Sequence, residues 1–200
     1  AEALGSSING KKIGSISDSS IFSFCGNKVL TTGEGGAVVT NSKVLYEKIK
    51  SIRSHGRIDK INYFNNPSES NYPELGYNWR MSSITATLGI SQMKKLDKII
   101  KMRQENANYI SKHISAIKQL SVPKPPIGHE HIYQMYTIRL QNKKLRDELH
   151  QHLLEKKIFS KVYFTPIHFS AFYKEKLNMR PVLPVTETVS DQVLTLPLYP

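Results

Sequence analysis

The chain contains the stretch Ser23-Phe24-Cys25-Gly26-Asn27-Lys28, followed two residues later by Thr31-Thr32-Gly33-Glu34-Gly35-Gly36. One lysine therefore sits five residues after a serine and just ahead of a glycine-rich turn, and the strand-like run 37–40 leads away from it. An amine held on such a turn suits a Schiff base. The glycines leave room for a bulky cofactor, and the serine hydroxyl can bind its phosphate. Taken alone, the same pattern also fits a solvated lysine on an ordinary turn.

Both motifs strongly resemble the active-site segment of the sugar aminotransferases of the DegT/DnrJ/EryC1/StrS family. The resemblance covers essentially all 200 residues, and it implies an α/β chain with the type I PLP-transferase (aspartate aminotransferase-like) fold. It also implies pyridoxal 5'-phosphate (PLP) as cofactor and keto sugars on nucleotide carriers as substrates. Further matches follow in family order at Arg53-Ser54-His55-Gly56, Gly76-Tyr77-Asn78-Trp79-Arg80-Met81, His131-x-Tyr133, Pro166-Ile167-His168 and Leu196-Pro197-Leu198-Tyr199-Pro200.

The resemblance also implies roles for individual residues. Lys28 is the expected catalytic residue: it forms the Schiff base with PLP and, once freed, moves the proton between the substrate carbon and the cofactor. Some dehydratases of this superfamily carry histidine there, so a lysine favours transamination. Ser23 and Asn78 are expected to bind the cofactor phosphate, with Asn78 reaching it from the partner subunit of a homodimer with a shared active site. Arg80 and His168 are expected to bind substrate.

Composition narrows the class of protein. Lys and Arg number 28 against 16 Asp and Glu, a net charge of +12 that favours anionic partners. The basic residues are spread along the chain with no block typical of a nucleic-acid tail, but charge alone does not choose among nucleic acid, an acidic membrane surface and phosphorylated small molecules. The resemblance implies a nucleotide-diphosphate keto sugar and an amino-acid donor as partners, and no nucleic acid. No apolar run approaches the length of a membrane span, which predicts no membrane association. Cys25 is the only cysteine, so no disulfide forms within the chain, as fits a cytoplasmic protein.

Three other patterns lack a residue or a spacing that the site they suggest would require. The segment 5–12 nearly matches a phosphate loop, but Lys12 replaces the hydroxyl residue that should bind magnesium. The segments 129–131 and 150–152 each contain two histidines, which suggests a metal site. Histidines two residues apart do not share a helix face, however, so no metal site is predicted. The glycines of 33–36 lack the dinucleotide-binding spacing.

The pattern of elements divides the chain near Leu96. Residues 1–95 are expected to form the remainder of the large PLP-binding domain, and residues 96–200 a small α+β C-terminal domain. Family members extend before residue 1 and into a last helix after residue 200, so the resemblance implies part of a longer protein. The 200 residues alone are expected to be inactive.

The sequence also predicts individual elements. Helices are expected over 42–56, 82–92, 96–117 and 143–157, a helix end over 1–6 and a helical turn over 186–193. Strands are expected over 133–140 and 158–164, an extended piece over 13–21 and a hairpin over 29–40. A turn is expected at 9–10 and an irregular connection over 57–76.

These features together predict a PLP-dependent aminotransferase that moves an amino group from glutamate to a keto-deoxyhexose of a nucleotide-diphosphate sugar. One alternative is an enzyme of the same family that acts on a non-sugar ketone or dehydrates a sugar, which product analysis would distinguish. The other is a non-catalytic basic interaction protein. Salt-sensitive binding to nucleic acid without a PLP absorbance band would favour that alternative.

Overall fold

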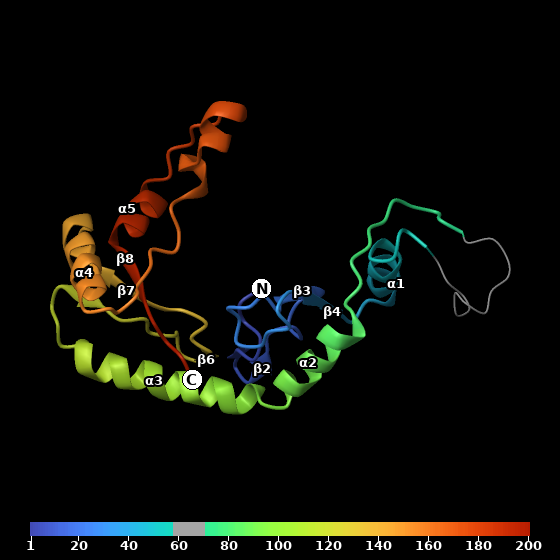
Figure 1. The fold of residues 1–200 in the computed structure, drawn as a ribbon, viewed down its shortest axis with the longest axis horizontal. Coiled ribbons are helices and arrows are strands. Elements are labelled where there is room, and N and C mark those ends of the chain that lie inside the picture. Colours follow the sequence, from blue (N-terminus) through green and yellow to red (C-terminus); the bar gives the residue numbers. More distant parts are fainter. Residues whose placement is uncertain (58–70) are drawn as a thin grey trace. The chain divides into compact units, whose positions relative to one another are not determined.

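The computed structural model describes residues 1–57 and 71–200, which group into two compact units. The first unit comprises Ala1–Lys98 and Gly128–Glu130, and the second comprises Ile99–Ile127 and His131–Pro200 (Figure 1). The irregular connection predicted over 57–76 falls, for residues 58–70, outside the described residues.

A small antiparallel sheet of order β2-β1-β6 lies in the first unit. Strands β1 (Ser7–Ile8) and β2 (Lys11–Lys12) are joined by the predicted turn at 9–10, where both residues have positive φ (49° and 76°), as a tight Asn-Gly hairpin turn requires. Strand β6 (His129–Glu130) pairs with the other edge of β1. The helix end predicted over 1–6 is wrong. The N–H of Ser6 instead donates to the carbonyl of Ala3 at 3.0 Å.

The motif that carries the predicted lysine joins two strands of the first unit. Strand β3 (Ser19–Ser23) pairs antiparallel with β4 (Gly36–Thr40), with Ser23 opposite Gly36. The predicted hairpin over 29–40 is therefore wrong, because β4 takes its partner from upstream. The physical reason is burial: Val29 and Leu30 are almost completely buried and anchor the loop 24–35 rather than pairing as a strand.

Two helices of the first unit confirm the prediction to within a few residues. Helix α1 (Lys43–Ile52) begins at Ser42, whose hydroxyl accepts the Leu45 N–H at 3.3 Å. Helix α2 (Ser83–Met93) is capped in the same way by Ser82. The small residues of α2 allow a close approach, since a Cβ on Gly89 would lie 3.0 Å from the Thr32 side chain. Helix α2 therefore packs against the loop that carries Lys28.

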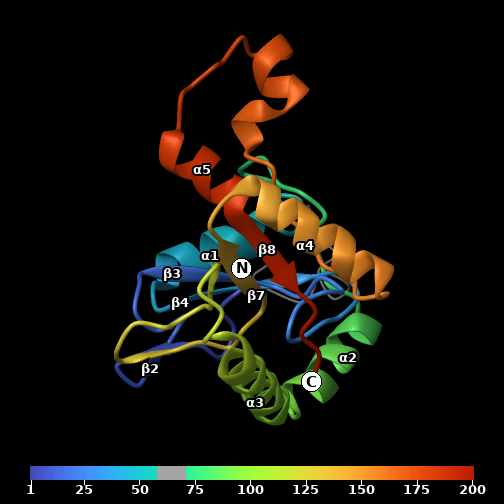
Figure 2. The same ribbon diagram turned by 90° about the vertical axis from the view of Figure 1, so that its left-hand side faces the viewer.

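The second unit is built on an antiparallel sheet of order β5-β7-β8. Its strands are β5 (Leu120–Ser121), β7 (Tyr136–Leu140) and β8 (Val193–Leu196). Helices α3 (Leu96–Ile114) and α4 (Lys143–Glu155) contribute side chains to the core on this sheet, and Figure 2 shows α4 lying along it. The buried core residues are Ala107, Tyr133, Tyr136, Ile138, Leu140, Leu194 and Leu198.

The predicted strand over 158–164 is wrong, because this segment forms no strand and β7 pairs with β8. Within that segment only Lys161 forms a bridge, to Thr195, while Phe159 and Phe164 are 75% and 65% exposed. These apolar side chains give the β-like composition, yet they are not buried against the sheet. The chain continues through the 3₁₀ helix η2 (Ile167–Phe169) and the π-helix η3 (Phe172–Lys176) to α5 (Pro184–Gln192), which confirms the predicted helical turn.

Removing the Leu194 side chain is expected to destabilise the protein substantially. The side chain is 0% exposed at the centre of this core, so Leu194→Ala should lower the free energy of unfolding by about 2–5 kcal/mol. Leu154→Ala is the matched control, because Leu154 in α4 is 43% exposed and should change stability by about 0.5 kcal/mol or less. Urea unfolding of the full-length protein measures both, and equal losses would contradict this core assignment.

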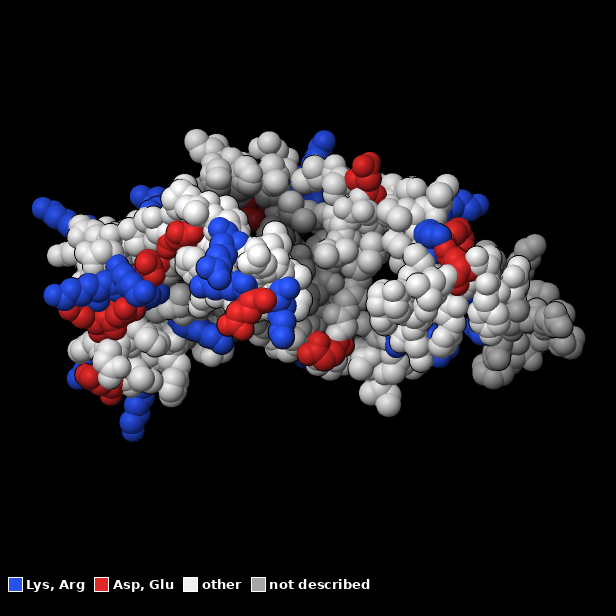
Figure 3. All heavy atoms as spheres, turned by 90° about the horizontal axis from the view of Figure 1, so that it is seen from above, with Lys and Arg blue, Asp and Glu red and all other residues white. Residues whose placement is uncertain are grey.

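Several charged side chains of the second unit lie close to partners of opposite sign. Lys143 lies 3.2 Å from Asp191, and Lys144 lies 3.9 Å from Glu148 on the next turn of α4. Figure 3 shows Lys and Arg side chains interspersed with Asp and Glu on the face in view.

Among residues 1–57 and 71–200, no helix combines the length and the apolar character needed to cross a bilayer.

Candidate active site

Backbone hydrogen bonds close the loop between β3 and β4 on itself. The Phe24 N–H donates to the Gly35 carbonyl at 2.9 Å, and the Phe24 carbonyl accepts from the Thr32 N–H at 2.9 Å and from the Thr31 hydroxyl at 3.1 Å. The Lys28 N–H donates to the Cys25 carbonyl at 3.0 Å, which makes a turn at the lysine itself. Each end of the loop is therefore fixed, and Lys28 is presented from a closed turn.

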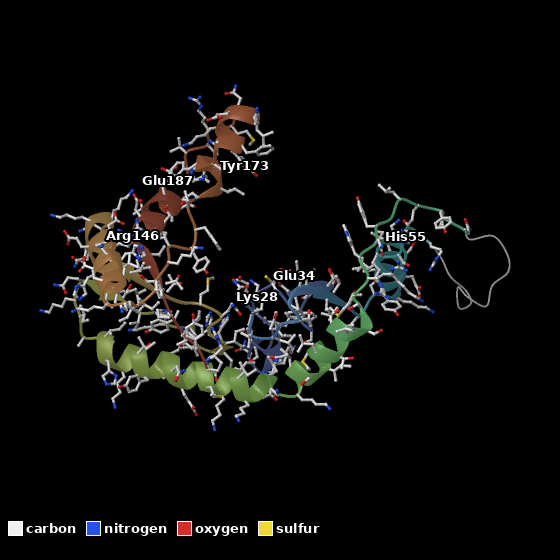
Figure 4. The ribbon with its side chains drawn as sticks, viewed as in Figure 1. Lys28, Glu34, His55, Arg146, Tyr173 and Glu187 are labelled. Atoms are coloured by element: carbon white, nitrogen blue, oxygen red, sulfur yellow. The ribbon has the colours of Figure 1, made fainter. Side chains whose placement is uncertain are left out.

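The Lys28 side chain is largely enclosed within the first unit. It is 14% exposed, and its ammonium group is ion-paired with the Glu2 carboxylate. Glu34 belongs to the same loop as Lys28 (Figure 4). One of its carboxylate oxygens lies 3.5 Å from the Cys25 sulfur. Sequence reasoning missed Glu2, because it belongs to no motif and lies 26 positions before the lysine. Only the fold brings the two side chains together.

Ser23 stands at the end of β3, at the start of the same loop. Its hydroxyl oxygen accepts the Cys25 N–H at 3.4 Å. That contact uses an oxygen lone pair and leaves the hydroxyl hydrogen to donate, which is what a phosphate oxygen requires. Ser23 and Lys28 are thus positioned by one loop of one chain.

Gly35 is the glycine of this loop whose lack of a side chain matters most. Its φ is 149°, and a Cβ there would lie 2.7 Å from the Thr32 hydroxyl and 2.8 Å from the Met81 methyl. Gly35→Ala should therefore introduce about 1–3 kcal/mol of strain and displace the loop that presents Lys28. We expect it to lower the fraction of Lys28 that borohydride couples to PLP in the full-length protein.

Gly26→Ala is the matched control for this prediction. A Cβ on Gly26 would meet only the Gly33 carbonyl oxygen, at 3.9 Å, which is ordinary contact. Peptide mapping should show normal coupling for Gly26→Ala and reduced coupling for Gly35→Ala. Equal coupling in the two variants would show that the tight fit at Gly35 does not govern the position of Lys28.

Asn78 and Arg80 lie on a different part of the first unit. The segment 77–79 runs antiparallel to 52–55: Asn78 bridges Ser54, and the Tyr77 carbonyl accepts the His55 N–H at 2.8 Å. The Asn78 side-chain oxygen accepts a hydrogen bond from Arg80 Nε at 2.8 Å, so the structure brings these two predicted residues together. Figure 4 places His55 at the end of α1, well apart from Lys28.

Sequence reasoning also missed the pairing of the two aromatic residues that alternate with Asn78 and Arg80. The rings of Tyr77 and Trp79 are stacked, with centroids 4.1 Å apart and planes 3° from parallel. Both rings remain substantially exposed. In an extended segment, neighbouring side chains point to opposite faces, so the aromatic residues lie on one face and the polar pair on the other.

His168 lies in the second unit and is buried. Its Nε2 atom is 3.1 Å from a Glu187 carboxylate oxygen, which also accepts the Leu183 N–H at 2.9 Å. The backbone hydrogen bond from Leu183, followed by the one from His168, lowers the pKa of Glu187. Because these contacts favour the ionised carboxylate, their contribution to stability is present at neutral pH and is lost as the pH falls through that lowered pKa. The contact ties η2 to α5, and substrate binding by His168 stays a prediction.

Within residues 1–57 and 71–200, no three His, Cys, Asp or Glu side chains gather in a way that could hold a metal ion. The polar contacts of the β3–β4 loop are separate: the Lys28 amine pairs with the Glu2 carboxylate, and the Cys25 thiol lies against the Glu34 carboxylate.

Comparison with known structures defines the class of protein. The structure superposes on that of Helicobacter pylori PseC, an aminotransferase involved in the biosynthesis of pseudoaminic acid, with a TM-score of 0.89 and 29% identity. The match covers 100% of this chain and 53% of that one. The fold is thus that of the type I PLP-transferases, which confirms the expected α/β class. The chain belongs to the DegT/DnrJ/EryC1/StrS aminotransferase family, whose pattern it matches over residues 1–200.

Sequence relatives agree with this assignment. The chain is 34% identical over 200 residues to the GDP-perosamine synthase of Escherichia coli O157:H7, a match that spans 100% of this chain and 52% of that protein. It is 39% identical over 180 residues to a UDP-4-amino-4,6-dideoxy-N-acetyl-beta-L-altrosamine transaminase of Campylobacter jejuni, spanning 89% and 46% of the two chains. The chain therefore spans about half the length of the curated relatives it matches.

Proposed function

We propose that the full-length protein is a PLP-dependent aminotransferase that moves an amino group from glutamate to a keto-deoxyhexose of a nucleotide-diphosphate sugar. The observation that carries this proposal is the enclosed Lys28 amine, presented from a closed loop with the Ser23 hydroxyl at the start of that loop. The names of the relatives, a perosamine synthase and an amino-dideoxy-sugar transaminase, support a sugar substrate.

The residues present fit PLP chemically. The cofactor needs a primary amine for its aldehyde and hydrogen-bond donors for its phosphate, and Lys28 and Ser23 supply one of each from a single loop. PLP, when bound, acts as a sink for the electrons released at the substrate carbon. Lys28 then holds and moves the proton between that carbon and the cofactor. Asn78 adds an uncharged amide donor for the phosphate.

The proposed active site is shared between two copies of the chain. Asn78 lies on the segment beside His55, which Figure 4 shows well apart from Lys28, so in our proposal its amide serves the cofactor of the partner subunit. Exposed apolar side chains around this segment support burial against another surface, among them Leu75 (80% exposed), Trp79 (65%) and Ile84 (84%). Arg80, hydrogen-bonded to Asn78, is placed to bind the diphosphate or a carboxylate of the substrate.

The proposal is tested by reducing the full-length protein with borohydride in the presence of PLP and mapping the modified peptide. We expect a phosphopyridoxyl group on Lys28. The same preparation is then incubated with glutamate and candidate nucleotide keto sugars, and we expect an aminated nucleotide sugar by mass spectrometry. Absence of the label from the full-length protein would overturn the proposal, and a dehydrated product would replace transamination with dehydration.

A further inference from the structure

The Lys28 amine has a partner that the proposed chemistry does not use. Glu2 lies in an irregular segment before β1, yet its carboxylate is ion-paired with the Lys28 ammonium. The lysine side chain is 14% exposed and the glutamate side chain 43%, so one end of the pair is enclosed and the other reaches solvent. The contact joins residues 26 positions apart and fixes the end of a long, flexible side chain.

The other nearby carboxylate is engaged elsewhere. Glu34 belongs to the same loop as Lys28, but its carboxylate oxygen lies against the Cys25 sulfur at 3.5 Å. Holding a lysine side chain in one position opposes its considerable rotamer entropy, so a fixed amine needs a specific partner. In this structure that partner is Glu2, and Glu34 provides a natural internal comparison.

We infer that Glu2 is a positioning residue for Lys28, an inference that rests on the proposed function. In the cofactor-free protein, the Glu2 carboxylate holds the Lys28 ammonium group in one position at the β3–β4 loop. To bond to PLP, the lysine leaves Glu2 and gives one proton to solvent water. Its nitrogen then joins the aldehyde carbon, and the aldehyde oxygen leaves as water together with the remaining two amine protons. The partial exposure of Glu2 gives the released proton a route to solvent.

Acetylation of the free amine tests this inference directly. The full-length protein is stripped of PLP and treated briefly with acetic anhydride, and the acetylation rate of each lysine is measured by peptide mass spectrometry. The rate at Lys28 is divided by that at Lys11, an exposed lysine of β2. Because an amine released from its carboxylate reacts more readily, Glu2→Gln should raise this ratio by about fivefold, as the loss of a modest ion pair allows. Glu2→Asp, which keeps the carboxylate, should give an intermediate ratio.

Glu34→Gln is the matched control and should leave the ratio at its wild-type value. The inference is overturned if Glu2→Gln leaves the ratio unchanged, or if Glu34→Gln raises it as much. Because Lys11 is already exposed, its rate corrects for differences in reagent and reaction time, and Glu34→Gln in the same loop as Lys28 controls for general loosening. Labelling of wild-type Lys28 by PLP and borohydride separates the two proposals. With that label present and no effect of Glu2, only the role of Glu2 fails. With no label, the proposed function itself fails.

Discussion

Lys28→Ala should lower the transamination rate of the full-length protein by about a thousandfold, because it removes the amine that moves the proton during the reaction. It should also abolish the phosphopyridoxyl label at position 28, since alanine has no nitrogen to bond with the cofactor. Because the Lys28 side chain is enclosed, another side chain of the protein cannot easily reach the position of its amine and take over its role. The measurement is the rate of aminated nucleotide sugar formed from glutamate.

Lys11→Ala is the control for this prediction. Lys11 lies in β2 of the same compact unit and is exposed, so its replacement removes one positive charge without touching the β3–β4 loop. Its activity should match that of the wild type. Unchanged transamination in Lys28→Ala would rule out an aminotransferase mechanism that depends on Lys28.

Asn78→Ala should weaken PLP binding by about tenfold to a hundredfold, the effect of losing a hydrogen bond to a charged group.

A more informative result is expected when Asn78→Ala chains are mixed with Lys28→Ala chains. If Asn78 serves the partner's cofactor, a dimer of one Lys28→Ala chain and one Asn78→Ala chain contains one fully intact site. Random mixing makes half of the dimers mixed, with one of two sites restored, so about a quarter of wild-type activity should return. The two variants are denatured together, refolded and assayed at limiting PLP.

A mixture of Lys28→Ala with Ser23→Ala chains is the matched control. Ser23 and Lys28 lie on one loop of one chain, so every site in such a dimer lacks one of the two side chains. Activity should stay at the mean of the two separate variants. The same lack of recovery in the mixture that contains Asn78→Ala would show that Asn78 does not act across subunits.

Local signals account for the elements that the sequence predicted correctly. The Asn9-Gly10 turn and the serine caps at Ser42 and Ser82 depend on residues within a few positions of one another. Strand pairing, in contrast, does not depend on residues that are close in the sequence. The sequence placed the partner of β4 across the nearest glycines and a second strand of the C-terminal domain over 158–164, whereas β4 pairs with β3 and β7 pairs with β8. Each alternative had suitable composition, and only burial in the folded chain distinguished them.

The sequence by itself determined the family, the fold class and the expected reactive lysine. The motif that indicates them places the lysine and the glycines of its turn in one short stretch of the chain, so it can be recognised without the fold. The tertiary structure decided what surrounds that lysine. Glu2 reaches Lys28 from 26 positions away, and His168 is buried against Glu187, contacts that no local pattern specifies. Ion pairs and buried hydrogen bonds depend on distances that exist only once the chain has folded.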